Sequence, residues 1–137
     1  VSYDPENHEE MSLLRAQKVA GISKTFDPTH IQGEAEGDLL VIGWGGTYGA
    51  ISSAARNLRD EGFSISNIHL RHLNPLPDDL EEIMSRFKKV IVPELNLGQL
   101  NLLLRAKYLV DVISYGKLQG KPFKVSELHK KFLEYLR

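Results

Sequence analysis

From residue 39 onward, short apolar runs alternate with segments whose apolar residues recur at helical spacing. This alternation limits the possible folds more than any other feature of the sequence. The run at residues 39–42 contains no polar position, which is typical of a strand buried on both faces. In residues 51–58 the apolar positions fall at i, i+3, i+4 and i+7, as on one face of a helix. Strands that alternate with helices of about 10–15 residues form βαβ units. We therefore predict a three-layer α/β/α fold with a mostly parallel sheet.

The same patterns predict the position of each element. Core strands are expected at residues 39–42, 63–70, 90–92 and 109–114, and a short edge strand at residues 30–35. Helices are expected at residues 6–22, from the glycine-rich turn to residue 61, from Pro77 to residue 89, at residues 97–108, and over the last 13 or so residues. Gly62 occupies the position after a helix where a left-handed residue is favoured.

Composition narrows the functional classes. The chain has 137 residues, about one domain's length, and a formal net charge of −1. A near-neutral charge argues against a nucleic-acid module, although the N-terminal part is acidic and the last 21 residues are basic. The chain has no cysteine, which excludes disulfides and cysteine-ligated clusters within it. No apolar run is long enough to span a membrane. We expect a cytoplasmic globular domain, and the missing initial Met suggests a fragment.

In parallel sheets, ligands collect at the carboxyl ends of the strands, where four loops are expected. The first loop holds Gly43, Trp44, Gly45, Gly46, Thr47 and Tyr48, and it fits neither common nucleotide-binding glycine motif. It is interpreted either as a tight turn that packs a helix on a strand or as a contact for an anion or ligand. Trp44 and Tyr48 would stack on a ligand or cover an interface, and we favour the interface. We expect Gly46 or Gly49 to need a positive φ.

The other loops supply further candidates. His69, Arg71, His72 and Asn74 follow the second strand, Glu94 and Asn96 follow the third, and residues 115–117 follow the fourth. Arg71 between two histidines disfavours a cation, so we predict no metal site. Glu94 is positioned either for acid/base chemistry or to cap the amides of the next helix. By residues alone, the chain has no complete active site.

Three stretches carry a resemblance to a known family. Residues 68–76, IHLRHLNPL, are similar to the D-L-R-x-L-x-P-L segment in the C-terminal domain of thiamine-diphosphate 2-oxoacid dehydrogenases. His69 stands where that segment has Asp, so a role of that Asp does not carry over. Residues 41–49 and 92–100 resemble the alpha subunit of 2-oxoacid:ferredoxin oxidoreductases, most closely the 2-oxoglutarate enzyme.

The resemblance implies a fold and a division of the chain. It implies a transketolase C-terminal-like domain with a five-stranded mixed sheet in the order 1-3-2-4-5, whose antiparallel first strand is residues 30–35. Residues 1–28 would be a helical connector and residues 29–137 the domain. In that topology, the glycine-rich loop and the Glu94 loop flank one crevice.

The resemblance also implies a function. The whole enzyme would oxidatively decarboxylate a 2-oxoacid to its acyl-coenzyme A and reduce ferredoxin, using thiamine diphosphate, magnesium and iron–sulfur clusters held outside this chain. This chain would be an inactive structural and assembly domain. Its partners would be the other alpha-subunit domains and the thiamine-diphosphate-binding beta subunit. Excised, it would self-associate as a homo-oligomer with Trp44 near the contact.

The sequence is also compatible with two other functions. The first is a free-standing α/β module that binds a small molecule or anion at residues 43–49. The second is a regulatory domain that binds an acidic metabolite near His69, Arg71 and His72.

Overall fold

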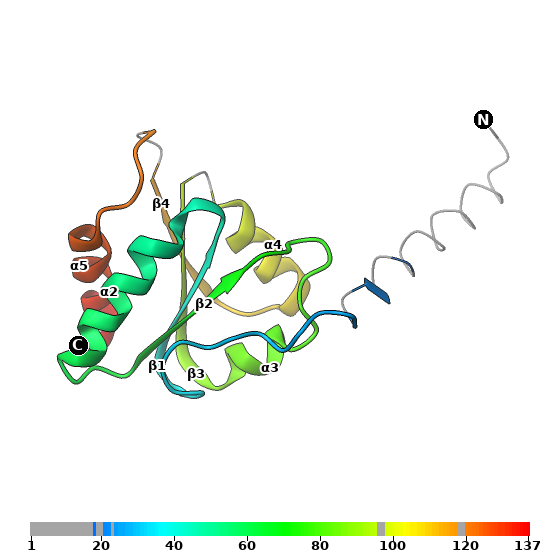
Figure 1. The fold of residues 1–137 in the computed structure, drawn as a ribbon, viewed down its shortest axis with the longest axis horizontal. Helices are drawn as coiled ribbons and strands as arrows, with labels where there is room; N and C mark the ends of the chain where they lie inside the picture. Colours follow the sequence, from blue (N-terminus) through cyan, green and yellow to red (C-terminus); the bar gives the residue numbers. More distant parts are fainter. Residues whose placement is uncertain (1–17, 19–20, 23, 96–97, 118–119) are drawn as a thin grey trace, which may run out of the picture.

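Four parallel strands form the central sheet, in the order β2-β1-β3-β4 (Figure 1). They are β1 (Gly37–Trp44), β2 (Ile65–Leu70), β3 (Phe87–Glu94) and β4 (Val112–Gly116). The computed structural model describes residue 18 and residues 21–22, 24–95, 98–117 and 120–137. The predicted order of the core strands and the α/β fold class are confirmed.

Helices cover both faces of the sheet. On one face, α2 (Tyr48–Asp60) and α5 (Val125–Leu136) pack against Leu39 and Val41 of β1. On the other face, α3 (Leu80–Ser85) and α4 (Gln99–Tyr108) pack against Leu40 and Ile42. Successive residues of a strand point to opposite faces, so the unbroken apolar run of β1 supplies both cores. The predicted three-layer arrangement is therefore present.

The predicted fifth strand at residues 30–35 is reduced to one antiparallel bridge between Gln32 and Asn67. Their backbone amides and carbonyls exchange hydrogen bonds of 2.9 and 3.0 Å. Gly33, with a φ of 103°, then turns the chain, and the Ser66 hydroxyl donates to the Glu34 carbonyl at 2.7 Å. A side chain thus satisfies a carbonyl that a continued ladder would have used, and the sheet has four strands instead of five.

Several predicted boundaries are wrong. The third helix was expected to begin at Pro77 and to include Phe87, but α3 spans Leu80–Ser85 and Phe87 begins β3. Phe87 is buried and pairs with Gly37 of β1 in the parallel ladder, which places it in the strand. The fourth strand begins at Val112, because Leu109 adopts a left-handed conformation that ends α4.

The predicted helix at residues 6–22 lies mostly outside the described residues, where Lys18, Gly21 and Ile22 are helical. The left-handed conformation expected at Gly62 is confirmed by its φ of 96°. Among the described residues, no helix has the length and apolar character needed to cross a membrane.

Candidate functional site

The glycine-rich loop is a tight strand-to-helix turn. β1 continues to Trp44, two residues beyond its predicted end, and a short 3-10 turn, η1 (Gly45–Thr47), leads directly into α2. Gly45 has a φ of 63°, whereas neither Gly46 nor Gly49 has a positive φ, so the expectation for those two glycines is wrong. The chain reverses at the first residue after the strand, and the later glycines already follow helical geometry.

Gly43 allows α2 to lie close to β1. A Cβ atom at this position would lie 2.6 Å from Ile51 Cδ1 and 3.1 Å from Thr47 Oγ1, closer than ordinary packing permits. The Thr47 hydroxyl is buried and donates to the Trp44 carbonyl at 2.9 Å. These contacts favour the interpretation of this loop as a closely packed turn.

A buried carboxylate joins the ends of the two central strands. Glu94, 1% exposed at the end of β3, accepts a hydrogen bond at Oε1 from the Trp44 indole Nε1 at 3.0 Å. Oε1 also accepts from the Leu100 amide at 2.7 Å, and Oε2 accepts from the Asn101 amide at 3.2 Å. Because Glu94 caps the first turn of α4, the capping interpretation is confirmed. Asn96, the other candidate in this loop, lies outside the described residues.

The Trp44–Glu94 hydrogen bond also crosses the predicted crevice. The strand order reverses between β1 and β3, where a ligand site was expected. Trp44 is partly buried there and packs against the core on the α3 and α4 face. Side chains of the chain itself therefore link the two loops that were expected to diverge. Tyr48, in contrast, is 47% exposed, and its role at an interface remains a prediction.

A cavity of about 790 Å³ lies instead at the end of β2. One wall is formed by residues 25–30 and Gln32, and the other by Asn67 and residues 69–72, with Tyr48 and Pro77 at the sides. His69, Arg71 and His72 thus share one cavity, as the acidic-metabolite hypothesis requires. Asn74 is exposed and is not part of the lining.

Ring contacts shape this cavity. His72 stacks on Phe26 with ring centroids 4.5 Å apart, and His69 meets Tyr48 edge-on at 5.2 Å. Burial, and secondarily the positive charge of Arg71, lower the pKa of His69 below its usual value. The buried Nδ1 of His69 has no hydrogen-bond partner among the described residues. The lowered pKa favours the neutral form of His69, and Arg71 gives this end of β2 a permanent positive charge.

The sequence did not identify residues 25–30 and Gln32 as residues that line a cavity. Residues 25–32 were interpreted as a connector with a short edge strand, and no local pattern marked Phe26 or Gln32 as cavity residues. Gln32 reaches three partners far along the chain: its Nε2 donates to Tyr48 Oη at 2.8 Å, and its Oε1 accepts from Asn67 and Ser52. Buried Ser66 and Asn67, next to each other in the predicted strand, were a signal of polar partners nearby.

No group of three or more His, Cys, Asp or Glu side chains that could hold a metal ion occurs in the part of the chain that the structure describes. His30, His69 and His72 line the cavity. His129 pairs with one carboxylate, that of Glu61, at 2.9 Å.

Comparison with known proteins identifies the fold and the family. Residues 37–128 match the family described as pyruvate:ferredoxin oxidoreductase core domain II. The 2-oxoglutarate oxidoreductase subunit KorA of Mycobacterium tuberculosis is 48% identical over 132 residues, which cover 93% of this chain and 19% of that protein. The chain therefore spans about a fifth of the length of this relative.

Solved structures agree with this assignment. A 2-oxoglutarate:ferredoxin oxidoreductase from Magnetococcus marinus, with 2-oxoglutarate, coenzyme A and succinyl-CoA bound, superimposes with a TM-score of 0.90 at 32% identity, covering 99% of this chain and 24% of that one. A split-gene transketolase shares the fold at 20% identity, with a TM-score of 0.57 over 82% of this chain and 44% of its own. The chain thus belongs to the pyruvate:ferredoxin oxidoreductase core domain II family, and its resemblance to the C-terminal domain of a 2-oxoacid:ferredoxin oxidoreductase alpha subunit is confirmed.

Proposed function

We propose that this chain is the structural and assembly domain of the alpha subunit of a 2-oxoglutarate:ferredoxin oxidoreductase. The observation that carries the proposal is the match of nearly the whole chain, at a TM-score of 0.90, to about a quarter of a much longer 2-oxoglutarate enzyme chain. The whole enzyme would convert 2-oxoglutarate and coenzyme A to succinyl-CoA and carbon dioxide, with transfer of the electrons to ferredoxin.

The residues that the structure describes show no site for the enzyme's prosthetic groups. The described residues contain no group of three or more His, Cys, Asp or Glu side chains that could hold a metal ion. Iron–sulfur clusters are held by cysteine thiolates, and the full sequence contains no cysteine. On the family resemblance, we place thiamine diphosphate, magnesium and iron–sulfur clusters in other domains or subunits, and we derive no chemical step in this chain.

The environment of Glu94 supports a structural role. Both carboxylate oxygens accept hydrogen bonds, from one side chain and two backbone amides. A carboxylate with this many donors is suited to holding β1, β3 and α4 in register. The glycine-rich turn is likewise explained by close packing at Gly43 and by the positive φ of Gly45. No observation favours the free-standing module that would bind a ligand at residues 43–49.

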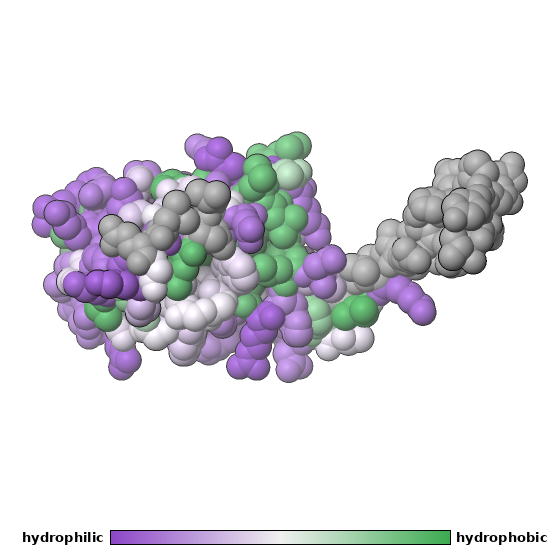
Figure 2. All heavy atoms as spheres, turned by 90° about the horizontal axis from the view of Figure 1, so that it is seen from above, coloured by the Kyte–Doolittle hydropathy of each residue, from purple (hydrophilic) through white to green (hydrophobic). Residues whose placement is uncertain are grey.

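An apolar surface supports docking to the rest of the enzyme. Four exposed leucines lie on α4, directly after it or directly after β3, and we call them the α4 face: Leu95, Leu102, Leu103 and Leu109, which are 41%, 69%, 40% and 89% exposed. Figure 2 shows hydrophobic surface on the side of the molecule where Figure 1 places α4. Large exposed apolar patches mark interaction sites. We assign this face to contact with another domain of the alpha subunit or with the beta subunit.

The test uses the full-length alpha subunit that contains this chain, co-expressed with its beta subunit. The complex is expected to reduce ferredoxin or a viologen dye with 2-oxoglutarate and coenzyme A, and more slowly with pyruvate. Deletion of residues 29–137 should abolish both the assembly seen by size exclusion and the turnover. An assembled, fully active complex without these residues would contradict the structural role. Faster turnover of pyruvate would contradict the assigned substrate.

A further inference from the structure

We propose that the cavity at the end of β2 binds an organic anion whose carboxylate or phosphate group pairs with Arg71. This site lies apart from the Trp44–Glu94 linkage, and its occupation does not depend on the enzyme activity proposed above. The volume of about 790 Å³ falls within the range of about 300–1,000 Å³ typical of small-molecule sites.

The wall opposite β2 is held in place by hydrogen bonds within the chain. Thr29 donates to Asp79 through its backbone amide at 2.7 Å and through its hydroxyl at 2.6 Å. Gln32 pairs with Asn67 through backbone and side chain. These contacts tie residues 25–32 to α3 at one end and to β2 at the other. The cavity is therefore formed before a ligand arrives, which lowers the ordering cost of binding.

Arg71 is the group of the lining that would bind an anion. Arg71 is exposed and forms no ion pair with any described residue, while His30, His69 and His72 line the same cavity. A guanidinium offers a planar fork of donors that matches carboxylate and phosphate geometry. Asp27 is the carboxylate of the lining that opposes this preference. Nearby Asp79 does not compete for Arg71 in the same way, because both of its oxygens accept from Thr29.

The rings of the lining favour an organic ligand over a bare inorganic ion. The stacked Phe26–His72 pair and the edge-on Tyr48–His69 pair supply apolar surface beside the guanidinium. Tyr48 Oη accepts a hydrogen bond from Gln32, so its own hydroxyl hydrogen remains for donation. One guanidinium, one hydroxyl and several rings together suit a carboxylate or phosphate carried on a carbon scaffold.

The experiment measures binding to the full 137-residue chain by calorimetry and by amide chemical-shift changes in NMR. Three probes are titrated: succinate for a dicarboxylate, adenosine 5′-diphosphate for a phosphate ester, and inorganic phosphate alone. We expect saturable binding of succinate or of the diphosphate, with shifts confined to residues around the cavity. The probe that binds more tightly identifies whether the anion is a carboxylate or a phosphate ester.

Matched variants distinguish binding at this cavity from a general attraction of the anion to the positive charges of the chain. Arg71→Gln should weaken binding at least tenfold, and Arg56→Gln, which removes an exposed cation outside the lining, should leave it unchanged. Asp27→Asn should tighten binding, a gain that a misfolded variant would not show. The proposal is overturned by equal binding to the Arg71 variant, by no saturable binding of either organic probe, or by inorganic phosphate that binds as tightly as both. Because no turnover is measured, these outcomes are independent of the enzyme assay.

Discussion

Glu94 connects residues 50 positions apart in the chain, because its carboxylate accepts the indole hydrogen bond of Trp44 as well as two amides of α4. Hydrogen bonds to a buried charged group contribute about 1.5–3 kcal/mol each. Losing the acceptor also leaves the Leu100 amide, in a buried hydrogen bond, and two partly buried donors without partners. At the residue scale, this side chain links β1, β3 and α4 at the carboxyl edge of the sheet.

Glu94→Ala is therefore expected to lower the free energy of unfolding by at least about 2 kcal/mol, since each orphaned buried donor costs about 1–3 kcal/mol. Trp44→Phe, which keeps an aromatic ring and removes one donor, should cost less. Denaturant titrations followed by circular dichroism measure both effects, with exposed Glu81→Ala as the control. A double variant whose loss equals the sum of the two single losses would show that Trp44 and Glu94 do not interact.

The lowered pKa of His69 predicts that the stability of the fold depends on pH. Its pKa in the folded chain is lowered from the usual 6.5, first by burial and then by Arg71. The unfolded chain therefore takes up a proton before the folded chain does, so the contribution is fully present above about pH 6.5 and is lost as the pH falls through the folded pKa. Unfolding measured between about pH 7.5 and pH 5 should show a steeper loss for the parent than for His69→Gln.

Titration of the Glu127 carboxylate does not contribute to the change in stability between about pH 7.5 and pH 5. The hydrogen bond from Lys117 holds the pKa of Glu127 below its usual 4.5, so its contribution is present above that value and is lost only at more acidic pH. Identical pH slopes for the parent and His69→Gln would mean that the imidazole is protonated equally in the folded and unfolded chains.

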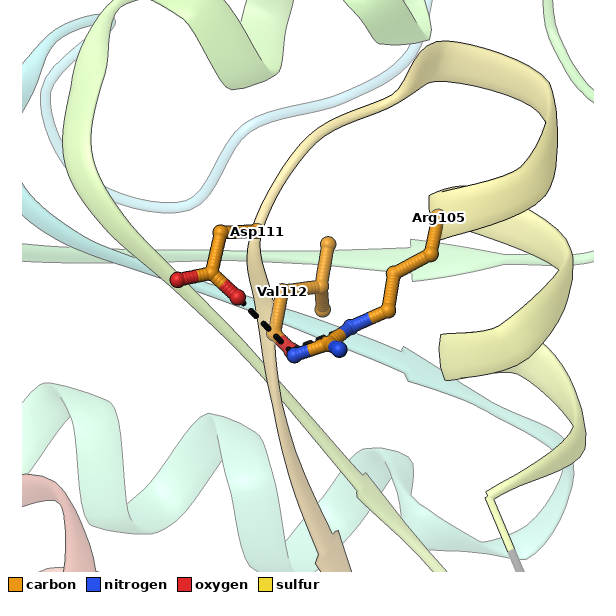
Figure 3. A network of polar contacts seen from close by, with 3 residues as sticks. All are labelled: Arg105, Asp111 and Val112. Carbon is orange, nitrogen blue, oxygen red and sulfur yellow. Dashed lines mark hydrogen bonds and ion pairs between the residues drawn. The ribbon is translucent and has the colours of Figure 1, made fainter.

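At the element scale, the turns decide how closely the helices approach the sheet. Gly43 and Gly45 allow α2 to follow β1 after three residues of 3-10 turn. At the end of α4, Arg105 reaches across the next turn: its Nε and Nη2 donate to the Val112 carbonyl at 3.1 and 2.7 Å, and Nη2 pairs with Asp111 at 2.9 Å (Figure 3). This bridge fixes the start of β4 although Leu109 adopts a left-handed conformation with a φ of 55°.

Alanine substitutions of the glycines in the turn after β1 should change the free energy of unfolding by different amounts. Gly45→Ala places a side chain at a φ of 63° and should cost about 1–2 kcal/mol. Gly43→Ala overpacks the contact with Ile51 and should cost about 1–3 kcal/mol. Gly46→Ala meets no atom within 4 Å and serves as the matched control, neutral or slightly stabilising. Denaturant melts in which Gly46→Ala is the least stable of the three variants would refute this account of the turn.

On the scale of the whole molecule, two cores flank one sheet, and the α4 face remains exposed on the outside of one of them. The division of the chain into a connector of residues 1–28 and a domain of residues 29–137 remains a prediction. Residues 25–28 line the same cavity as residues 29, 30 and 32, so the last part of the connector contributes to a domain feature.

Without the rest of its enzyme, the chain is expected to associate through the α4 face. Leu102→Lys introduces a charge at a side chain that is 69% exposed, and it should lower the apparent mass in sedimentation velocity without changing the circular dichroism spectrum. Val125→Lys, at an apolar residue 36% exposed on α5, is the matched control and should associate like the parent. Parent and Leu102→Lys both sedimenting as monomers would contradict this assignment.

The sequence by itself determined the alternation of strands and helices, the fold class and the left-handed residue at Gly62, because each depends on periodicity or conformational preference within a few neighbouring residues. Resemblance of short motifs added the strand order and the family. The tertiary structure alone decided that Gly45 rather than Gly46 turns the chain, that Trp44 reaches Glu94, and that residues 25–32 form one wall of a cavity with His69, Arg71 and His72. Those outcomes depend on contacts between residues tens of positions apart, and no local pattern specifies which distant side chain will satisfy a buried donor.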